Sequence, residues 1–183
     1  MGGWGPECFF VVEGGGNLIL QPVTQLEVLT NSLLVNQFRP EVLSDLVWHK
    51  QVPLKVSILA WRLLQNRHLY VRGVLPLANQ HCVVGCGDID TTQHLFLSCP
   101  FYATLWGEIR SWLGVPAAEP LCVSDHFYQF VYSAGGSRTI RSFMQLIWLC
   151  CVWVLWNERT SRVFKNMEHT VHQLVEKVKL HSF

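Results

Sequence analysis

Residues 82–99 read CVVGCGDIDTTQHLFLSC, and the prediction of the fold starts from the four metal-binding residues in this stretch. Cys82, Cys86, His94 and Cys99 are separated from one another by three, seven and four residues. Structural Zn²⁺ sites are tetrahedral, and three cysteines with one histidine form one of the usual ligand sets. The spacing therefore predicts a closed structural zinc site, since four protein ligands leave no position for a reactive water.

Turn and helix signals surround these four residues. Gly85 and Gly87 flank the second cysteine, where a ligand loop needs backbone that turns sharply and tolerates positive φ. Thr91 or Thr92 is suited to cap a short helix that carries the histidine, and Pro100 is suited to end it. The local signals thus agree with the metal-binding interpretation.

The alternative is that these are ordinary buried cysteines beside a surface histidine, because free cysteine is often a small buried hydrophobic residue. The spacers consist of turn-forming rather than core-forming residues, which favours the metal site. Disulfide bonds are a weaker alternative, because the number of cysteines, seven, is odd and the first 38 residues contain no Lys or Arg for a secretory signal. We therefore expect an intracellular, reducing location, with nucleus and cytoplasm both open.

The composition indicates a packed chain that is not strongly basic. Of its 183 residues, 50% are hydrophobic and only 15% are charged, which argues against disorder. The net charge is +1, so any nucleic-acid binding must come from local patches. The run 143–156 is apolar but shorter than the ~20 residues of a membrane span, and we expect a buried core helix. Arginines on both sides of this run leave an interfacial role as the alternative, but no membrane partner is expected.

Helical periodicity and turn residues divide the chain into four segments. Helices are expected over about 24–35, from Pro53 onwards, and over 101–113, 138–165 and 168–180. The predicted fold class is mostly α, a small zinc-stapled helical domain with appended C-terminal helices. The segments are a poorly defined N-terminal segment with one helix (1–43), the zinc-binding domain (44–113), a linker (114–137) and a C-terminal helical segment (138–183).

The chain also resembles a known module, through a pattern that extends on both sides of the cysteines. This pattern consists of Trp48-x4-Pro53-x-Lys55-x5-Trp61-Arg62, the Cys82/Cys86/His94/Cys99 set with Leu95-Phe96, Cys99-Pro100-Phe101, and Trp106. Over about residues 44–112 it resembles the reverse transcriptase zinc-binding domain of plant non-LTR (LINE-type) retrotransposon polyproteins. One departure is that three residues lie between the first two cysteines, where much of the family has two. Structural zinc sites use spacers of two to four, so the extra residue should be tolerated.

The resemblance implies a structural Zn²⁺ held by Cys82, Cys86, His94 and Cys99. It also implies a non-catalytic accessory domain whose partner is the remainder of a reverse transcriptase polyprotein. The sequence contains no Tyr-x-Asp-Asp signature for a polymerase, and we expect no endonuclease or RNase H domain in a chain of this size. His81, Asp88 and Asp90 are candidates for general bases, but the favoured interpretation is that they are solvated loop residues.

Contact with RNA or single-stranded DNA is the remaining expectation. Five cations precede the metal loop, interleaved with tryptophans: Lys50, Lys55, Arg62, Arg67 and Arg72. Guanidinium groups bind phosphate and aromatic rings stack on bases, so these residues are candidate nucleic-acid ligands. The sequence equally allows Trp48 and Trp61 to be core residues and the cations a solvated rim. The competing hypothesis is a structural or protein-interaction module that does not bind nucleic acid.

Overall fold

The computed structural model describes residues 46–65, 81–116, 120, 122–135 and 137–182. Over these residues the protein is mostly helical, as predicted, and its only bridge between extended segments joins His81 and Ile89. The segment 1–43, with its expected helix, lies outside the described residues. In chain order the helices are α3 (Leu54–Leu64), a π-helical turn η3 (His94–Ser98), α4 (Pro100–Leu113), α5 (Val123–Tyr132), α6 (Arg138–Lys165) and α7 (Val171–Ser182).

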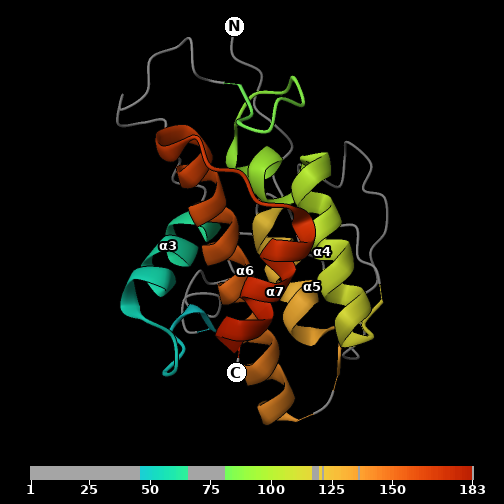
Figure 1. Cartoon of the computed structure of the whole chain (residues 1–183). Coiled ribbons are helices and arrows are strands. Elements are labelled where there is room, and N and C mark those ends of the chain that lie inside the picture. The colour runs from blue at the N-terminus through green and yellow to red at the C-terminus, as the bar shows by residue number, and fades with distance from the viewer. Residues whose placement is uncertain (1–45, 66–80, 117–119, 121, 136, 183) are drawn as a thin grey trace, which may run out of the picture.

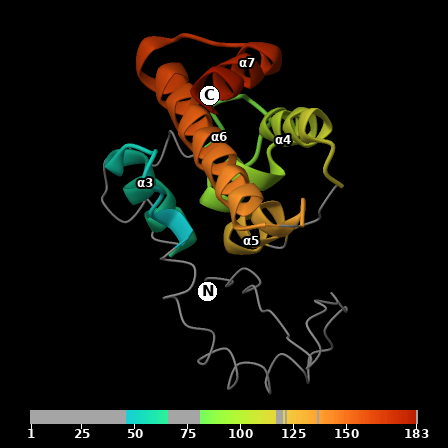
Figure 2. The ribbon, with the colours of Figure 1, turned by 90° about the horizontal axis from the view of Figure 1, so that it is seen from below.

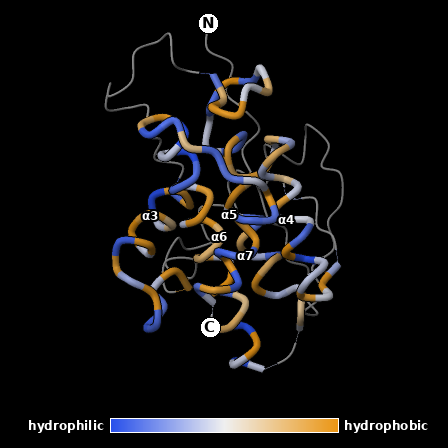
Figure 3. Tube along the Cα trace, viewed as in Figure 1, coloured by the Kyte–Doolittle hydropathy of each residue, from blue (hydrophilic) through white to orange (hydrophobic). Residues whose placement is uncertain are grey.

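Helix α6 is the central element. It lies between α3 and α4 in the view of Figure 2, with α5 and α7 near its two ends. Ser137 caps its first turn by accepting a hydrogen bond from Ile140 N, and Asn166, in the left-handed conformation, ends it. The chain then reverses, and α7 returns along α6 (Figure 1). Hydrophobic and hydrophilic residues alternate along the outer helices in Figure 3, as expected where one side of each helix faces the core.

The apolar run within α6 is buried, which confirms the prediction of a core helix. Trp148, Leu149, Cys151, Val152 and Leu155 are all fully buried. By length and composition alone, α6 would also be able to cross a membrane, and half of its most apolar stretch is buried inside this fold.

The segment 114–137, predicted as a linker around the short apolar stretch 127–132, contains α5 in its central part. Phe127, Phe130 and Val131 of this helix are buried against α6, and one hydrophobic core includes side chains from α3 through α7. The C-terminal helices are therefore part of the same core as the segment 44–113. The prolines and glycines on both sides of α5 suggested a linker, but they only delimit a short helix.

An aromatic group fixes α5 against α4 and α6. The indole of Trp148 donates a hydrogen bond to His126 Nδ1 at 3.0 Å, and the Trp106 ring meets the His126 ring edge-on at 4.3 Å. Burial lowers the pKa of His126 to about 3, and the nearby Arg110 charge adds to the effect. His126 is therefore neutral in the folded protein at physiological pH.

Acidification should destabilise the protein through His126. Its pKa is about 3 when folded, against about 6.5 for an unfolded histidine, so the unfolded chain binds the extra proton first as the pH falls. The stability supplied by the neutral ring is present above pH 6.5 and declines as the pH falls towards 3. Between pH 7 and pH 5 this group alone should remove about 2 kcal/mol from the free energy of unfolding.

Urea denaturation at several pH values would measure this loss. His126→Asn keeps an acceptor for the Trp148 indole but does not titrate, so its stability should vary less with pH by about the same amount. Equal pH dependence in the two proteins would contradict this assignment.

Candidate metal centre

The structure brings the four predicted ligands together. One donor atom from each of Cys82, Cys86, His94 and Cys99 lies within 4.8 Å of the other three. All of these residues are buried except Cys86, which is exposed. This is the only such group among the residues that the structure describes.

The donor atoms fit a tetrahedral zinc ion. With zinc–sulfur bonds of about 2.3 Å, two thiolates in a tetrahedron lie about 3.8 Å apart. The Sγ atoms of Cys82 and Cys99 are 3.8 Å apart and match this spacing, whereas Cys86 Sγ lies 3.1 Å from His94 Nε2, closer than the ~3.6 Å of a zinc-bound sulfur–nitrogen pair. Three sulfurs and one imidazole form a closed donor set for Zn²⁺, which would supply cross-linking rather than catalysis.

The first two ligands lie on a tight loop. Cys82 N donates to Asp88 O at 2.8 Å, and Gly85 N donates to Cys82 O at 2.9 Å. Gly85 and Gly87 have φ of +77° and +95°, conformations that glycine adopts without strain. The prediction that these glycines permit the sharp turn around Cys86 is therefore confirmed.

The last two ligands lie at either end of a single π-helical turn. Thr91 Oγ1 accepts a hydrogen bond from His94 N at 3.0 Å, which confirms the predicted cap. Cys99 N donates to His94 O at 2.7 Å, so the turn closes over five residues rather than four. Pro100 then starts α4 instead of merely ending the preceding turn. The π turn thus brings His94 and Cys99 to the same site.

Ionisation of the Cys82 thiol is unfavourable in this cluster unless a cation is bound. Burial, together with the neighbouring Cys86 and Cys99, raises the pKa of the Cys82 thiol to about 12. A metal ion reverses this preference because it binds thiolate and displaces the proton. The second ring nitrogen of His94, Nδ1, lies 3.5 Å from the Asp88 carboxylate, which orients the ring with Nε2 towards the sulfurs.

Asp90 is not the solvated loop residue that the sequence suggested. Its side chain is 2% exposed and accepts a hydrogen bond from Arg159 Nε of α6 at 2.7 Å. The guanidinium of Arg159 also lies over the Trp156 ring. A buried ion pair therefore fastens the ligand loop to the central helix, while Asp88 and His81 are exposed as expected. Sequence reasoning missed this pair because its members lie 69 positions apart in the chain.

Residues 31–106 match a family model described as zinc-binding in reverse transcriptase. This segment of the chain is therefore similar to the zinc-binding domain of reverse transcriptases. The match covers less than half of the chain and ends within α4, so α5, α6 and α7 lie beyond it. No curated protein and no solved structure matches the chain. The zinc-binding domain contains all four residues of the cluster, and zinc is accordingly the metal that this site is suited to bind.

Three of the five cations predicted to bind nucleic acid lie within the described part of the chain, and all three are exposed. Lys55 and Arg62 are exposed on α3, and Lys55 Nζ lies 4.8 Å from the centre of the Trp153 ring. Lys50 is exposed in the turn before α3, whereas Arg67 and Arg72 lie outside the described residues. Of the two tryptophans, Trp61 is half-buried against the core and Trp48 is 47% exposed. The core interpretation thus fits Trp61 but not Trp48.

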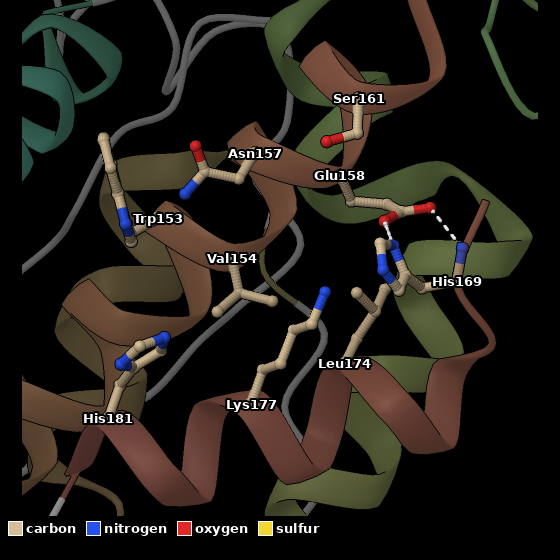
Figure 4. Close-up of a pocket in the computed structure, with 9 residues that line it drawn as sticks. All are labelled: Trp153, Val154, Asn157, Glu158, Ser161, His169, Leu174, Lys177 and His181. Carbon is tan, nitrogen blue, oxygen red and sulfur yellow. Dashed lines mark hydrogen bonds and ion pairs between the residues drawn. The ribbon is translucent and has the colours of Figure 1, made fainter. Parts of the chain in front are cut away.

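A second polar cluster lies beside a pocket of about 240 Å³ between α6 and α7 (Figure 4). The buried Glu158 carboxylate accepts hydrogen bonds from His169 N at 3.0 Å, from Arg162 Nε at 2.7 Å, and pairs with His169 Nδ1 at 2.7 Å. Burial opposes ionisation, but these hydrogen bonds hold the pKa of Glu158 below its ordinary value. Because its polar groups satisfy one another, the cluster stabilises the reversal from α6 to α7.

Proposed function

We propose that this chain is a non-catalytic, zinc-binding accessory segment of a plant LINE-type reverse transcriptase that contacts RNA or single-stranded DNA. Its zinc ligands are Cys82, Cys86, His94 and Cys99. The observation that carries the proposal is the convergence of these four donors within a domain matched to zinc-binding in reverse transcriptase. The rest of a reverse transcriptase polyprotein is the expected partner.

The ligand set supports a structural rather than a catalytic zinc. Four protein donors fill a tetrahedron, so no position remains for an activated water. Asp90, which would be a candidate general base, is already paired with Arg159. The metal would therefore act on folding, and any function must come from the surface that the fold presents.

Exposed cations support contact with nucleic acid. Lys50, Lys55 and Arg62 are exposed, and Trp48 offers an exposed aromatic ring. Phosphate contacts by such groups release counterions, so binding weakens with salt with a slope of about −0.7 per phosphate on a single strand.

Fluorescence anisotropy with labelled RNA and DNA strands of about 20 nucleotides would test the proposal, since a single-strand module occupies ~4–16. We expect dissociation constants in the micromolar range or weaker, increasing with salt concentration. The metal-free protein should bind more weakly, because the loop and α4 depend on the same cluster. Absence of binding to both strands at low salt would reject the nucleic-acid part, and metal analysis showing no zinc would reject the ligand assignment.

The structural or protein-interaction alternative rests on the apolar run of α6 and on the amphipathic C-terminal helix. Within the described part of the chain, the run packs against α3, α5 and α7, and Leu174, Val175 and Val178 of α7 are buried against α4 and α6. Neither apolar face therefore favours an additional protein partner.

A further inference from the structure

We propose that a single strand of RNA or DNA binds in a groove of about 670 Å³ where the turn before α3 meets the start of α6. This inference rests on the proposed function and assigns its binding surface. The groove is lined by Leu46, Trp48, His49, Lys50, Gln51, Tyr132, Arg138, Arg141, Ser142 and Gln145. Its volume lies within the range of about 300–1,000 Å³ that ligand sites occupy.

The charge of the groove matches a phosphate backbone. Lys50, Arg138 and Arg141 are its charged residues, and no acidic side chain is among the described residues that line it. By contrast, the pocket between α6 and α7 contains the Glu158 carboxylate, whose partners are already supplied by the protein. Of these two cavities, only the groove has an excess of positive charge.

Two aromatic rings in the same groove are exposed to solvent. Trp48 is 47% exposed and Tyr132 is 36% exposed, although large aromatic side chains gain stability from burial. The Arg141 guanidinium lies 5.6 Å from the centre of the Tyr132 ring, which positions a cation beside an aromatic face. Cations that track a backbone together with rings that stack on bases are the combination found in single-strand binding sites.

The groove is held in shape by His49. Its Nδ1 accepts a hydrogen bond from Gln51 N at 3.3 Å, so the neutral ring carries its proton on Nε2 and donates to Ser142 Oγ at 2.8 Å. This bond joins the turn to α6, with Trp48 and Lys50 on either side of the histidine. The Trp48 indole and the Lys50 ammonium group therefore lie on a turn of fixed conformation, which lowers the entropy lost on binding.

The test compares substitutions at the two ends of one helix. Arg138 and Lys165 are the first and last residues of α6, and both are exposed. Arg138→Gln and Lys165→Gln therefore remove the same charge from inside and outside the groove. The probes are fluorescein-labelled oligo(U) and oligo(dT), titrated against the full chain at several salt concentrations.

We expect Arg138→Gln to weaken binding and to reduce the salt slope by about 0.7 for the lost phosphate contact, and Arg138→Gln combined with Arg141→Gln to reduce it by about 1.4. Trp48→Ala should weaken binding about tenfold or more without changing that slope, and Trp48→Phe should restore most of the affinity. Lys165→Gln should bind as the original protein does. Circular dichroism would verify that each variant is folded.

Three results would overturn the assignment, and they differ in meaning. If the unaltered chain binds neither strand, the proposed function fails together with the groove. If it binds, but the groove variants behave like Lys165→Gln, only the groove is rejected. If the groove variants lose binding to vesicles containing phosphatidylserine while retaining oligonucleotide binding, the groove recognises an anionic membrane surface instead.

Discussion

Cys86→Ser should abolish stoichiometric zinc binding and remove at least about 3 kcal/mol from the free energy of unfolding. Cys86 is exposed, and exposed substitutions usually change stability by no more than about 0.5 kcal/mol. Structural zinc contributes about 10–16 kcal/mol in zinc-finger peptides, so losing one of four ligands should have a far larger effect. For a chain of this length, the midpoint of thermal unfolding should fall by about 6–12 °C.

Cys150→Ser is the matched control for this substitution. Cys150 is a buried free cysteine of α6 that is not part of the metal cluster. This variant should lose some stability through packing but retain one zinc per chain. Mass spectrometry of the native protein and elemental analysis give the stoichiometry, and calorimetry gives the stability. A Cys86→Ser protein with full zinc content and unchanged unfolding would show that this cysteine is not a ligand.

Arg159→Met should destabilise the protein by about 3–5 kcal/mol, because it leaves the Asp90 carboxylate buried without its partner. Asp90 lies in the loop between Cys86 and His94, so loss of its anchor should also loosen the ligands. Zinc affinity should fall about 10- to 100-fold, as when outer contacts of metal ligands are removed elsewhere.

A double-mutant cycle would isolate the ion pair. Arg159→Met combined with Asp90→Asn removes both charges, and it should be more stable than Arg159→Met alone. Stability would be measured by urea denaturation and zinc affinity by competition with a chromogenic chelator. If the two substitutions add independently and zinc affinity is unchanged in both, the loop is not held by α6.

Local patterns were sufficient to predict the helices 101–113 and 138–165 and the grouping of Cys82, Cys86, His94 and Cys99. Each of these features is specified within a short stretch, by helical periodicity, by a glycine or by ligand spacing. The C-terminal helix begins at Val171 rather than 168, since residues 166–170 form the reversal between α6 and α7.

The features that sequence reasoning missed depend on contacts between distant segments. Helix α5 has ten residues between turn-forming segments. Its apolar face is stabilised by packing against α6, where Phe127 contacts Trp148. Asp90 looked solvated because its partner Arg159 is far along the chain. The groove likewise combines Trp48 with Arg138 and Arg141, residues that no local pattern connects.

The π turn also has a consequence for which insertions the metal site can accommodate. Between Cys82 and Cys86 lies the exposed Gly85, where an added Cβ would meet no other atom within 4 Å. One residue more or fewer there can be absorbed by solvent-facing chain. Between His94 and Cys99 the separation equals one closed ring of the helix, so any change of length would rotate one ligand away from the other. Divergent copies of this domain should therefore differ in length on the cysteine–cysteine side and keep a constant interval on the histidine–cysteine side.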